Sequence, residues 1–229
     1  MMLPSMKIEK NLTYEEIHEY VSKGWLYKVP DKYLTYELCL LAAKSSYRNS
    51  IPNFPKEFIS EELCLEIFKK IYLFDEGSFN YENIPIHCRT YNVFFLLTKQ
   101  GYYHKMMNKL MDANMAYVLV KANPRKYYKI NKKFRTPEIT LFYIEYCDKW
   151  CKKITFNNIP KHGYSFAVFI KILETDLRYY PIIPTEYKTN ELFDYITKLL
   201  EKRYVDTKLL ERIENDKKRC IRKGILKYL

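Results

Sequence analysis

Basic side chains and tyrosines alternate in one stretch of this sequence. Between Lys105 and Arg135, nine lysines and arginines accompany a single acidic residue, Asp112. Cationic side chains neutralise phosphates and aromatic rings stack on bases, so this composition suits single-stranded nucleic acid, either RNA or DNA. The candidate contacts are Lys105, Lys109, Lys121, Arg125, Lys126, Tyr127, Tyr128, Lys129, Lys132, Lys133 and Arg135. A solvated face with its tyrosines packed inward has the same composition, so both interpretations stay open.

A second basic cluster lies near the C-terminus. Its members are Lys217, Lys218, Arg219, Arg222 and Lys223. An acidic protein would suit this cluster as well as a nucleic acid would. The whole chain has a formal net charge of +12, which favours an anionic partner but equally describes an ordinary lysine-rich protein.

The cysteines were candidates for a metal site. Cys147 and Cys151 are four residues apart, a spacing that puts two thiols on one helical face, and His162 follows them. A structural zinc site needs four ligands, and no CxxC or HxxxH pattern supplies the others. Cys39 and Cys64 share one position of the repeat described below. We therefore expect buried structural thiols, with no metal and no cofactor.

Catalytic motifs are absent from the sequence. It contains no P-loop, no GxSxG nucleophile elbow, no HExxH pair, no zinc-deaminase pattern and no kinase signature. The four histidines, His18, His87, His104 and His162, stand far apart with no evident shared partner. We expect that the protein is not an enzyme.

The elements that must position the basic residues recur along the chain. Eight residues that can accept a hydrogen bond from the first turn of a helix are spaced 22 to 30 residues apart. They are Thr13, Thr35, Ser60, Thr90, Asp112, Thr136, Ser165 and Thr189. Five residues before most of these caps stands a proline, at Pro30, Pro55, Pro85, Pro160 and Pro184, with Asn131 in the same place. Proline ends one segment and fixes the approach to the next helix.

Each repeat thus predicts one helix of about ten residues after its cap, followed by a return segment. The return segment is either a short second helix or a 3₁₀ turn. One such repeat cannot bury its apolar face alone, whereas stacked repeats can. We predict an all-α fold, an α-solenoid of about eight repeats over residues 1–204. A basic amphipathic helix over 205–229 then packs on the array or extends from it. A non-repetitive helical bundle is the alternative.

A lysine recurs nine residues after the cap. It is present as Lys44, Lys69, Lys99, Lys121 and Lys198, while Glu145 and Glu174 replace it in two repeats. If the repeats stack, equivalent positions lie side by side and the lysines form a ladder. A lysine near a helix C-terminus also complements the helix dipole without any partner, so the column need not be a binding site.

Composition and hydropathy bear on location. Hydrophobic residues make up 48% of the chain, no run of 18 apolar residues occurs, and the segment from Met1 to Lys7 has no apolar signal-peptide core. We expect no membrane association. Free thiols fit a reducing, cytoplasmic location.

The clearest repeat, Pro30 to Lys44, reads PDKYLTYELCLLAAK, and the segments from Pro55 to Lys69 and from Pro184 to Lys198 match it well. This pattern resembles the short helical repeats of unknown function, with about 24 residues per repeat, that are abundant in giant viruses of amoebae and occur in some intracellular bacteria. The resemblance covers roughly residues 12–200. It implies an interaction array without assigned activity, a viral source, and a place in the host cytoplasm or the virion. It transfers no catalytic residue.

Two functions are consistent with these observations. The first is a non-enzymatic helical-repeat scaffold that binds another protein, with viral origin implied by the resemblance. The second is binding of RNA or single-stranded DNA through the tyrosine-rich basic stretch, for example within a viral transcription or translation assembly.

Overall fold

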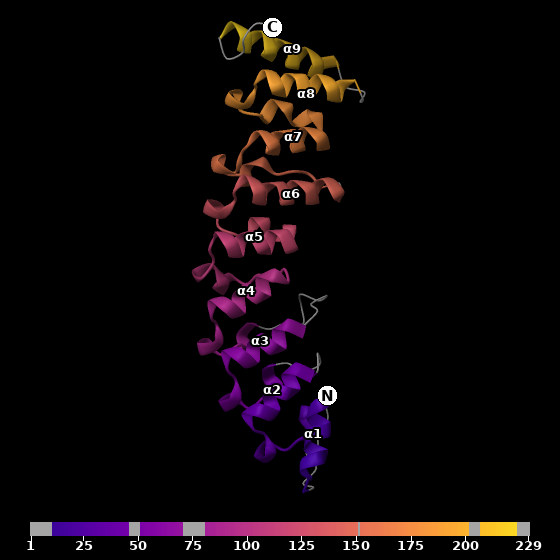
Figure 1. The fold of residues 1–229 in the computed structure, drawn as a ribbon. Coiled ribbons are helices and arrows are strands. Elements are labelled where there is room, and N and C mark those ends of the chain that lie inside the picture. The colour runs from indigo at the N-terminus through magenta and orange to yellow at the C-terminus, as the bar shows by residue number, and fades with distance from the viewer. Residues whose placement is uncertain (1–10, 46–50, 71–80, 151, 202–206, 224–229) are drawn as a thin grey trace, which may run out of the picture. The chain divides into compact units, whose positions relative to one another are not determined.

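The structure is a computed structural model that describes residues 11–45, 51–70, 81–150, 152–201 and 207–223. Over these residues the fold is helical, with nine α-helices joined by 3₁₀ turns (Figure 1). The chain forms two compact units, an N-terminal unit over Met1–Met111 and a C-terminal unit over Asp112–Leu229. Residues 1–10 and Cys151, one of the candidate thiols, lie outside the described residues.

Both units stack helices in tandem. The N-terminal unit contains α1 (Tyr14–Ser22), α2 (Tyr36–Ser45), α3 (Glu61–Lys70) and α4 (Tyr91–Lys99), and the C-terminal unit contains α5 (Ala113–Ala122), α6 (Pro137–Lys149), α7 (Phe166–Thr175), α8 (Asn190–Leu200) and α9 (Thr207–Arg222). Within each unit, α1 to α4 and α5 to α8 pack on their sequence neighbours. This tandem packing confirms the predicted all-α solenoid.

All eight predicted caps are present. In each repeat the cap side chain accepts a hydrogen bond from the backbone N–H three residues later, at distances from 2.7 Å at Asp112 to 3.5 Å at Thr136. In α1 a capping box forms, because the Glu16 carboxylate also accepts a hydrogen bond from the Thr13 N–H. Each such cap contributes about 1 kcal/mol by satisfying a donor that the helix leaves unpaired.

The return segments are 3₁₀ turns rather than second α-helices. Most contain two short turns separated by the recurring proline, as in Leu26–Lys28 and Asp31–Tyr33 around Pro30. The residue before the proline, or before Asn131, is apolar and buried in six repeats. These six residues are Val29, Phe54, Ile84, Ile130, Ile159 and Ile183. The proline turn therefore aims one apolar side chain into the core of each of these repeats.

The core follows the helical period. In α3, α4, α5, α6 and α7, positions three, four, seven and eight after the cap are buried; in α7 they are Val168, Phe169, Ile172 and Leu173. Positions five and nine after the cap remain on the surface. This division leaves one face of each helix for the neighbouring repeats and another for solvent.

The described cysteines are buried and free. Cys39 and Cys64 occupy the packing position four residues after the cap, as predicted. Burial raises the pKa of the Cys39 and Cys147 thiols to about 11, so both stay protonated and unreactive at neutral pH. His162 donates from Nε2 to the Lys132 carbonyl at 2.9 Å and stands apart from Cys147 as an exposed residue of a 3₁₀ turn.

The terminal helix α9 packs on the C-terminal unit around a buried ion pair. Lys188 donates to the Asp216 carboxylate at 2.7 Å, and the Tyr180 hydroxyl donates to the same oxygen at 3.2 Å. Ile213 and Cys220 are buried on the same side of the helix. The apolar side of this predicted amphipathic helix thus carries Asp216 at its centre, and Asp216 is paired with Lys188.

Candidate functional site

The predicted basic stretch is divided between the two units. Lys105 and Lys109 lie on a 3₁₀ turn of the N-terminal unit, and the remainder of the stretch belongs to the C-terminal unit. Seven of its cations are exposed, namely Lys105, Lys109, Lys121, Arg125, Lys129, Lys132 and Lys133, while Lys126 is half-buried. Most of the predicted charge is therefore available to solvent, but not as one continuous surface of one unit.

Two predicted contacts lie in the core instead. Tyr127 is fully buried, stacks on Tyr143 with ring centroids 4.6 Å apart, and shares a hydrogen bond of 3.0 Å with Thr140. Burial raises the pKa of the Tyr127 hydroxyl to about 12. The Tyr127 ring is enclosed by the protein and its hydroxyl is already hydrogen-bonded, so a nucleic-acid base cannot stack on it. The contact predicted for Tyr127 is therefore wrong.

Arg135 is also buried, with only 5% of its surface exposed. Its guanidinium donates to the carbonyls of Tyr128, Ile130 and Asn158 at 3.2, 3.0 and 2.5 Å. It thereby ties one return segment to the next, and desolvation lowers its pKa. Arg135 is a structural cation and not a phosphate contact.

Tyr128 is intermediate between these cases. The residue is 39% exposed, while its hydroxyl shares a hydrogen bond with that of Tyr143. Tyr128 is therefore partly accessible to a ligand.

Three residues missed by the sequence interpretation, Tyr146, Trp150 and Lys152, form a group with the predicted contact Arg125. Arg125 donates from Nε to the Tyr146 hydroxyl oxygen at 2.7 Å, and Lys152 donates from Nζ to the same oxygen at 2.9 Å. The hydrogen bond from Lys152 and the charges of both cations lower the pKa of Tyr146. Trp150 stands beside this ring, 56% exposed, with the centroids 6.4 Å apart. We call Arg125, Tyr146, Trp150 and Lys152 the Tyr146 cluster.

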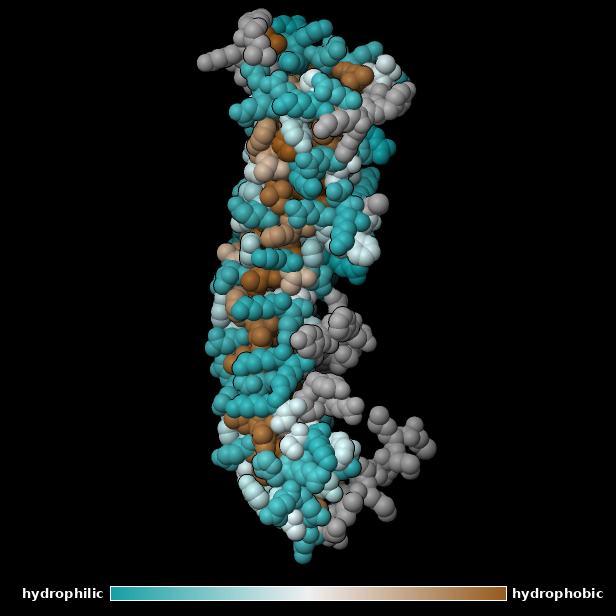
Figure 2. Space-filling view, turned by 45° about the vertical axis from the view of Figure 1, so that its right-hand side comes forward, coloured by the Kyte–Doolittle hydropathy of each residue, from teal (hydrophilic) through white to brown (hydrophobic). Residues whose placement is uncertain are grey.

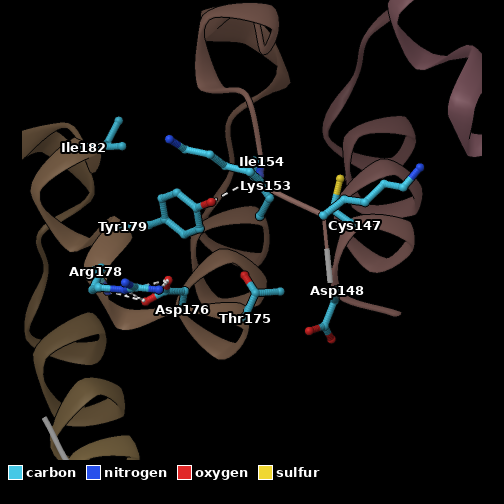
Figure 3. A pocket seen from close by; sticks show the side chains of 10 residues that line it. Cys147, Asp148, Lys153, Ile154, Thr175, Asp176, Arg178, Tyr179 and Ile182 are labelled. Carbon is cyan, nitrogen blue, oxygen red and sulfur yellow. Dashed lines mark hydrogen bonds and ion pairs between the residues drawn. The ribbon is translucent and has the colours of Figure 1, made fainter. Parts of the chain in front are cut away.

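The cluster borders a groove of about 740 Å³ between the C-terminal ends of α6 and α7 and the turn over Leu177–Ile182. Figure 3 shows the Tyr179 hydroxyl, which accepts from the Ile154 N–H at 3.1 Å, and Lys153, which extends toward Tyr179 and Ile182. We call this the α6–α7 groove. It combines an aromatic and aliphatic wall with cationic ends.

Charge in the groove is only partly balanced. Asp176 pairs with Arg178, and Asp148 lies 4.0 Å from Lys171. Lys153 forms no ion pair with any carboxylate among the described residues. The surplus of positive charge makes the groove attractive to an anion.

The C-terminal basic cluster is exposed at Lys218, Arg219, Arg222 and Lys223. Two of the cluster's residues also take part in packing. Arg219 lies 3.2 Å from Asp216, and the Lys217 ammonium lies 5.9 Å from the centre of the Phe193 ring. The cluster therefore helps to hold α9 in place, whatever else it contacts.

The N-terminal unit carries a different surface. Five residues after the cap, α2, α3 and α4 present Leu40, Leu65 and Phe95, all half-buried. Nine residues after the cap, the same helices present exposed lysines at Lys44, Lys69 and Lys99. We call this set the lysine-rimmed face.

Contacts between successive helices fix the register of this face. The Tyr36 hydroxyl on α2 reaches the Ser60 hydroxyl at 3.0 Å and the Glu62 carboxylate at 2.8 Å. On α3, Glu61 accepts from Thr90 and Asn92 at 2.8 and 3.0 Å. Equivalent residues of neighbouring helices are therefore held side by side, and the surface view shows hydrophobic residues, flanked by hydrophilic ones, that recur from helix to helix within each unit (Figure 2).

The predicted lysine ladder is interrupted in the C-terminal unit. Between Lys121 of α5 and Lys198 of α8, the position belongs to Glu145 and Glu174. Glu174 accepts from the Tyr195 hydroxyl at 2.5 Å and lies 3.2 Å from Lys171. Three consecutive lysines at this position thus occur on the N-terminal unit, where each rims an apolar residue.

Metal ligation and membrane crossing can be judged for the described residues. Among them, no group of three or more histidine, cysteine or acidic side chains is arranged to hold a metal ion. None of the helices described here has the length and hydropathy that a bilayer crossing requires.

A scan against known protein families, a search of curated proteins and a search of solved structures each found no match for this chain. The candidate surfaces therefore rest on their own geometry.

Proposed function

We propose that this protein is a non-enzymatic helical-repeat scaffold that binds an acidic, partly apolar segment of another protein on the lysine-rimmed face. The observation that carries this proposal is the repetition of one surface pattern on α2, α3 and α4. Each helix offers an apolar side chain and, one turn later, an exposed lysine. The resemblance of the repeats to those of giant viruses supports a scaffold role, with the host cytoplasm or the virion as the expected location.

The side chains of the lysine-rimmed face determine which kind of partner it can bind. On α4, Tyr91 stacks on Phe95 with centroids 5.6 Å apart, and the Lys99 ammonium lies 4.8 Å from the Phe95 ring centre. Rings and leucines in this row contribute affinity through apolar contact. The lysines set the sign of the partner's charge and speed its association.

Lys69 is the only one of the three lysines with an ion pair among the described residues, to Glu66 at 2.5 Å. Such an exposed pair is worth less than about 1 kcal/mol, so an incoming carboxylate can replace it. The face therefore keeps its positive character toward a ligand.

Selection of random peptides displayed on phage against the immobilised protein tests this proposal. We expect enrichment of peptides that combine several acidic residues with leucine, isoleucine or phenylalanine. The variant Lys44→Glu/Lys69→Glu/Lys99→Glu should lose these peptides, and Leu65→Ser should weaken them about ten-fold, since the burial of one leucine side chain is worth about 1.5–3 kcal/mol.

The matched control reverses three other exposed lysines of the same unit, as Lys28→Glu/Lys32→Glu/Lys56→Glu. It changes the net charge equally but leaves the lysine-rimmed face intact, so it should keep peptide binding. Equal loss in both triple variants, or selection of basic peptides, contradicts the proposal.

A further inference from the structure

Two cations in the Tyr146 cluster converge on one oxygen that does not balance their charge. Arg125 and Lys152 both donate to the Tyr146 hydroxyl, within 2.7 and 2.9 Å. A protonated phenol solvates a cation but carries no negative charge. The hydroxyl thus holds two positive charges close together, so one phosphate group can contact both.

No described carboxylate forms an ion pair with Arg125 or Lys152. The two nearest acids of the α6–α7 groove, Asp148 and Asp176, are directed toward Lys171 and Arg178. Lys153 adds a further cation at the other side of the groove (Figure 3). Lys152 lines the groove as well as the cluster, so the two sites adjoin.

The aromatic residue beside these cations, Trp150, is largely exposed. Trp150 is 56% exposed and lies at the C-terminal end of α6, next to Tyr146. A tryptophan in this position gains little from packing on the protein. It offers a stacking platform for a base, which is the second component of single-strand recognition.

We propose that the C-terminal unit binds single-stranded nucleic acid at the Tyr146 cluster, with a phosphate between Arg125 and Lys152 and a base stacked on Trp150. The strand continues into the α6–α7 groove, where Lys153 contacts the next phosphate and Tyr179 and Ile182 form the apolar wall. The groove volume of about 740 Å³ is within the range of sites that hold a ligand of nucleotide size.

Single strands suit this site better than duplexes or acidic proteins do. In a duplex the faces of the bases are stacked on one another, so none is free to reach Trp150. An acidic peptide would satisfy the cations but would leave the indole without a planar partner. This site is separate from the lysine-rimmed face and its failure would leave the proposed scaffold function untouched.

Binding of a fluorescein-labelled twelve-residue oligouridine to the full chain tests the proposal. We measure anisotropy at low salt, and we follow Trp150 emission in a Trp25→Phe background, because the chain has only two tryptophans. Stacking of a base on the indole should quench this emission as the anisotropy rises. The affinity should fall steeply with added salt.

Variants separate the two components of the site. Arg125→Ala/Lys152→Ala should weaken binding by about ten-fold or more and reduce the slope of log affinity against log salt by about 0.7, since both cations contact one phosphate and each phosphate contact on a single strand contributes about 0.7. Trp150→Leu should weaken binding about ten-fold while leaving the salt slope unchanged. The exchange Arg125→Lys/Lys152→Arg preserves the charges and should restore most of the affinity.

The matched control is Lys161→Ala/Lys198→Ala, which removes two exposed lysines of the same unit outside the cluster. It should stay within about two-fold of the parent at the same salt. All of these positions lie on the surface, and circular dichroism verifies that each variant is folded.

Several results would overturn the proposal. One is equal weakening by the control and cluster variants, which would indicate diffuse attraction. Another is binding without any quenching of Trp150. A third is competition by inorganic phosphate or by a poly-glutamate peptide at the concentrations where oligouridine competes. Absence of binding by the parent protein at low salt would exclude the site altogether.

Discussion

At the scale of the residue, the position directly before the N-cap is buried in several repeats, and it accommodates either an apolar or a cationic side chain. It holds Leu34 and Ile59 in α2 and α3 repeats and Arg135 and Lys188 in later ones, and all four are buried. The apolar residues fill the space between return segments. The cations occupy the same space because carbonyls or a carboxylate are there to receive them.

Gly163 gives a sharp test of packing between two repeats. A Cβ at this position would lie 2.6 Å from the Arg135 carbonyl oxygen and 3.1 Å from the Thr140 hydroxyl. Because a backbone atom cannot move aside cheaply, Gly163→Ala should lower the free energy of unfolding by about 1–3 kcal/mol. Urea denaturation measures this, with the exposed Asn157→Ala in the preceding turn as control. No loss in Gly163→Ala would show that the two return segments are not in such close contact.

At the scale of the element, α9 packs against its unit around one charged residue, Asp216, which has three partners in Lys188, Tyr180 and Arg219. Burial alone would raise the pKa of Asp216, but the hydrogen bond and charge of Lys188, with the charge of Arg219, outweigh it and hold that pKa below its usual value. Ile213 and Cys220 flank the ion pair on the same helix. The docking of α9 therefore depends on the ionisation of Asp216.

We expect the stability of the C-terminal unit to fall in acid through Asp216. A carboxyl whose pKa is lower in the folded state stabilises that state above its unfolded pKa, near 3.8, and loses this contribution as the pH falls through the folded pKa. Asp216→Asn should cost about 3 kcal/mol at neutral pH by leaving Lys188 buried and unpaired, and the difference from the parent should shrink below about pH 4.

The double variant Lys188→Met/Asp216→Leu is the control for this pair, since it removes both charges together and should recover most of the stability. Thermal melts monitored by circular dichroism from pH 3 to 7 compare the three proteins. A constant gap between parent and Asp216→Asn over this range would contradict the assignment.

The helix caps allow a graded prediction. Asp112 accepts from the Met115 N–H at 2.7 Å, while Thr136 accepts from the Ile139 N–H at 3.5 Å. Asp112→Ala should therefore cost about 1–2 kcal/mol and Thr136→Ala about 0.5 kcal/mol, as measured by urea denaturation. Equal costs would mean that the length of the hydrogen bond does not govern the cap.

The α-helices could be derived from the sequence because their signals are local. A cap, an apolar residue three positions later and a proline before the cap lie within nine residues of one another, and all eight predicted caps form. The 3₁₀ nature of the return segments could not be derived, because short apolar runs between prolines suit either kind of turn.

The candidate site could be derived only in part. Charge density along Lys105–Arg135 identified Arg125 but could not show that Tyr127 and Arg135 point inward, because the sequence does not state which face a 3₁₀ residue presents. Lys152 and Arg125 meet at the hydroxyl of Tyr146, which lies 21 residues after Arg125 in the sequence, and only the stacking of a return segment against α6 brings them together. The sequence signal that could have pointed to Trp150 and Lys152 was the run from Asp148 to Lys153, which contains three lysines and one tryptophan.

At the scale of the whole molecule, most contacts between helices join helices that are neighbours in the sequence. Within each unit, helices pack on the helices that precede and follow them, so stability should be a sum of neighbouring interfaces rather than one shared core. Damage to one helix should then spread to its neighbours and weaken with distance along the unit.

Phe169→Ala tests this behaviour, since Phe169 is fully buried in α7 and its truncation should cost about 3–5 kcal/mol. Amide hydrogen exchange should speed up in α6, α7 and α8 and stay unchanged in α1, α2 and α3. The reciprocal variant Phe68→Ala, in α3, should produce the opposite pattern. Uniform acceleration in either variant would mean that the two units unfold as one.

The side-chain caps also affect how repeats can be added to such a chain or lost from it. Because Ser, Thr or Asp at each cap satisfies a first-turn donor from within its own repeat, a helix does not need the preceding repeat to begin. A segment that runs from one cap to the next, such as Thr136 to Tyr164, therefore carries the cap of its own helix, as every other such segment does. Duplication or loss of whole segments leaves every remaining helix capped, so the number of surface positions offered to partners can vary by one repeat at a time.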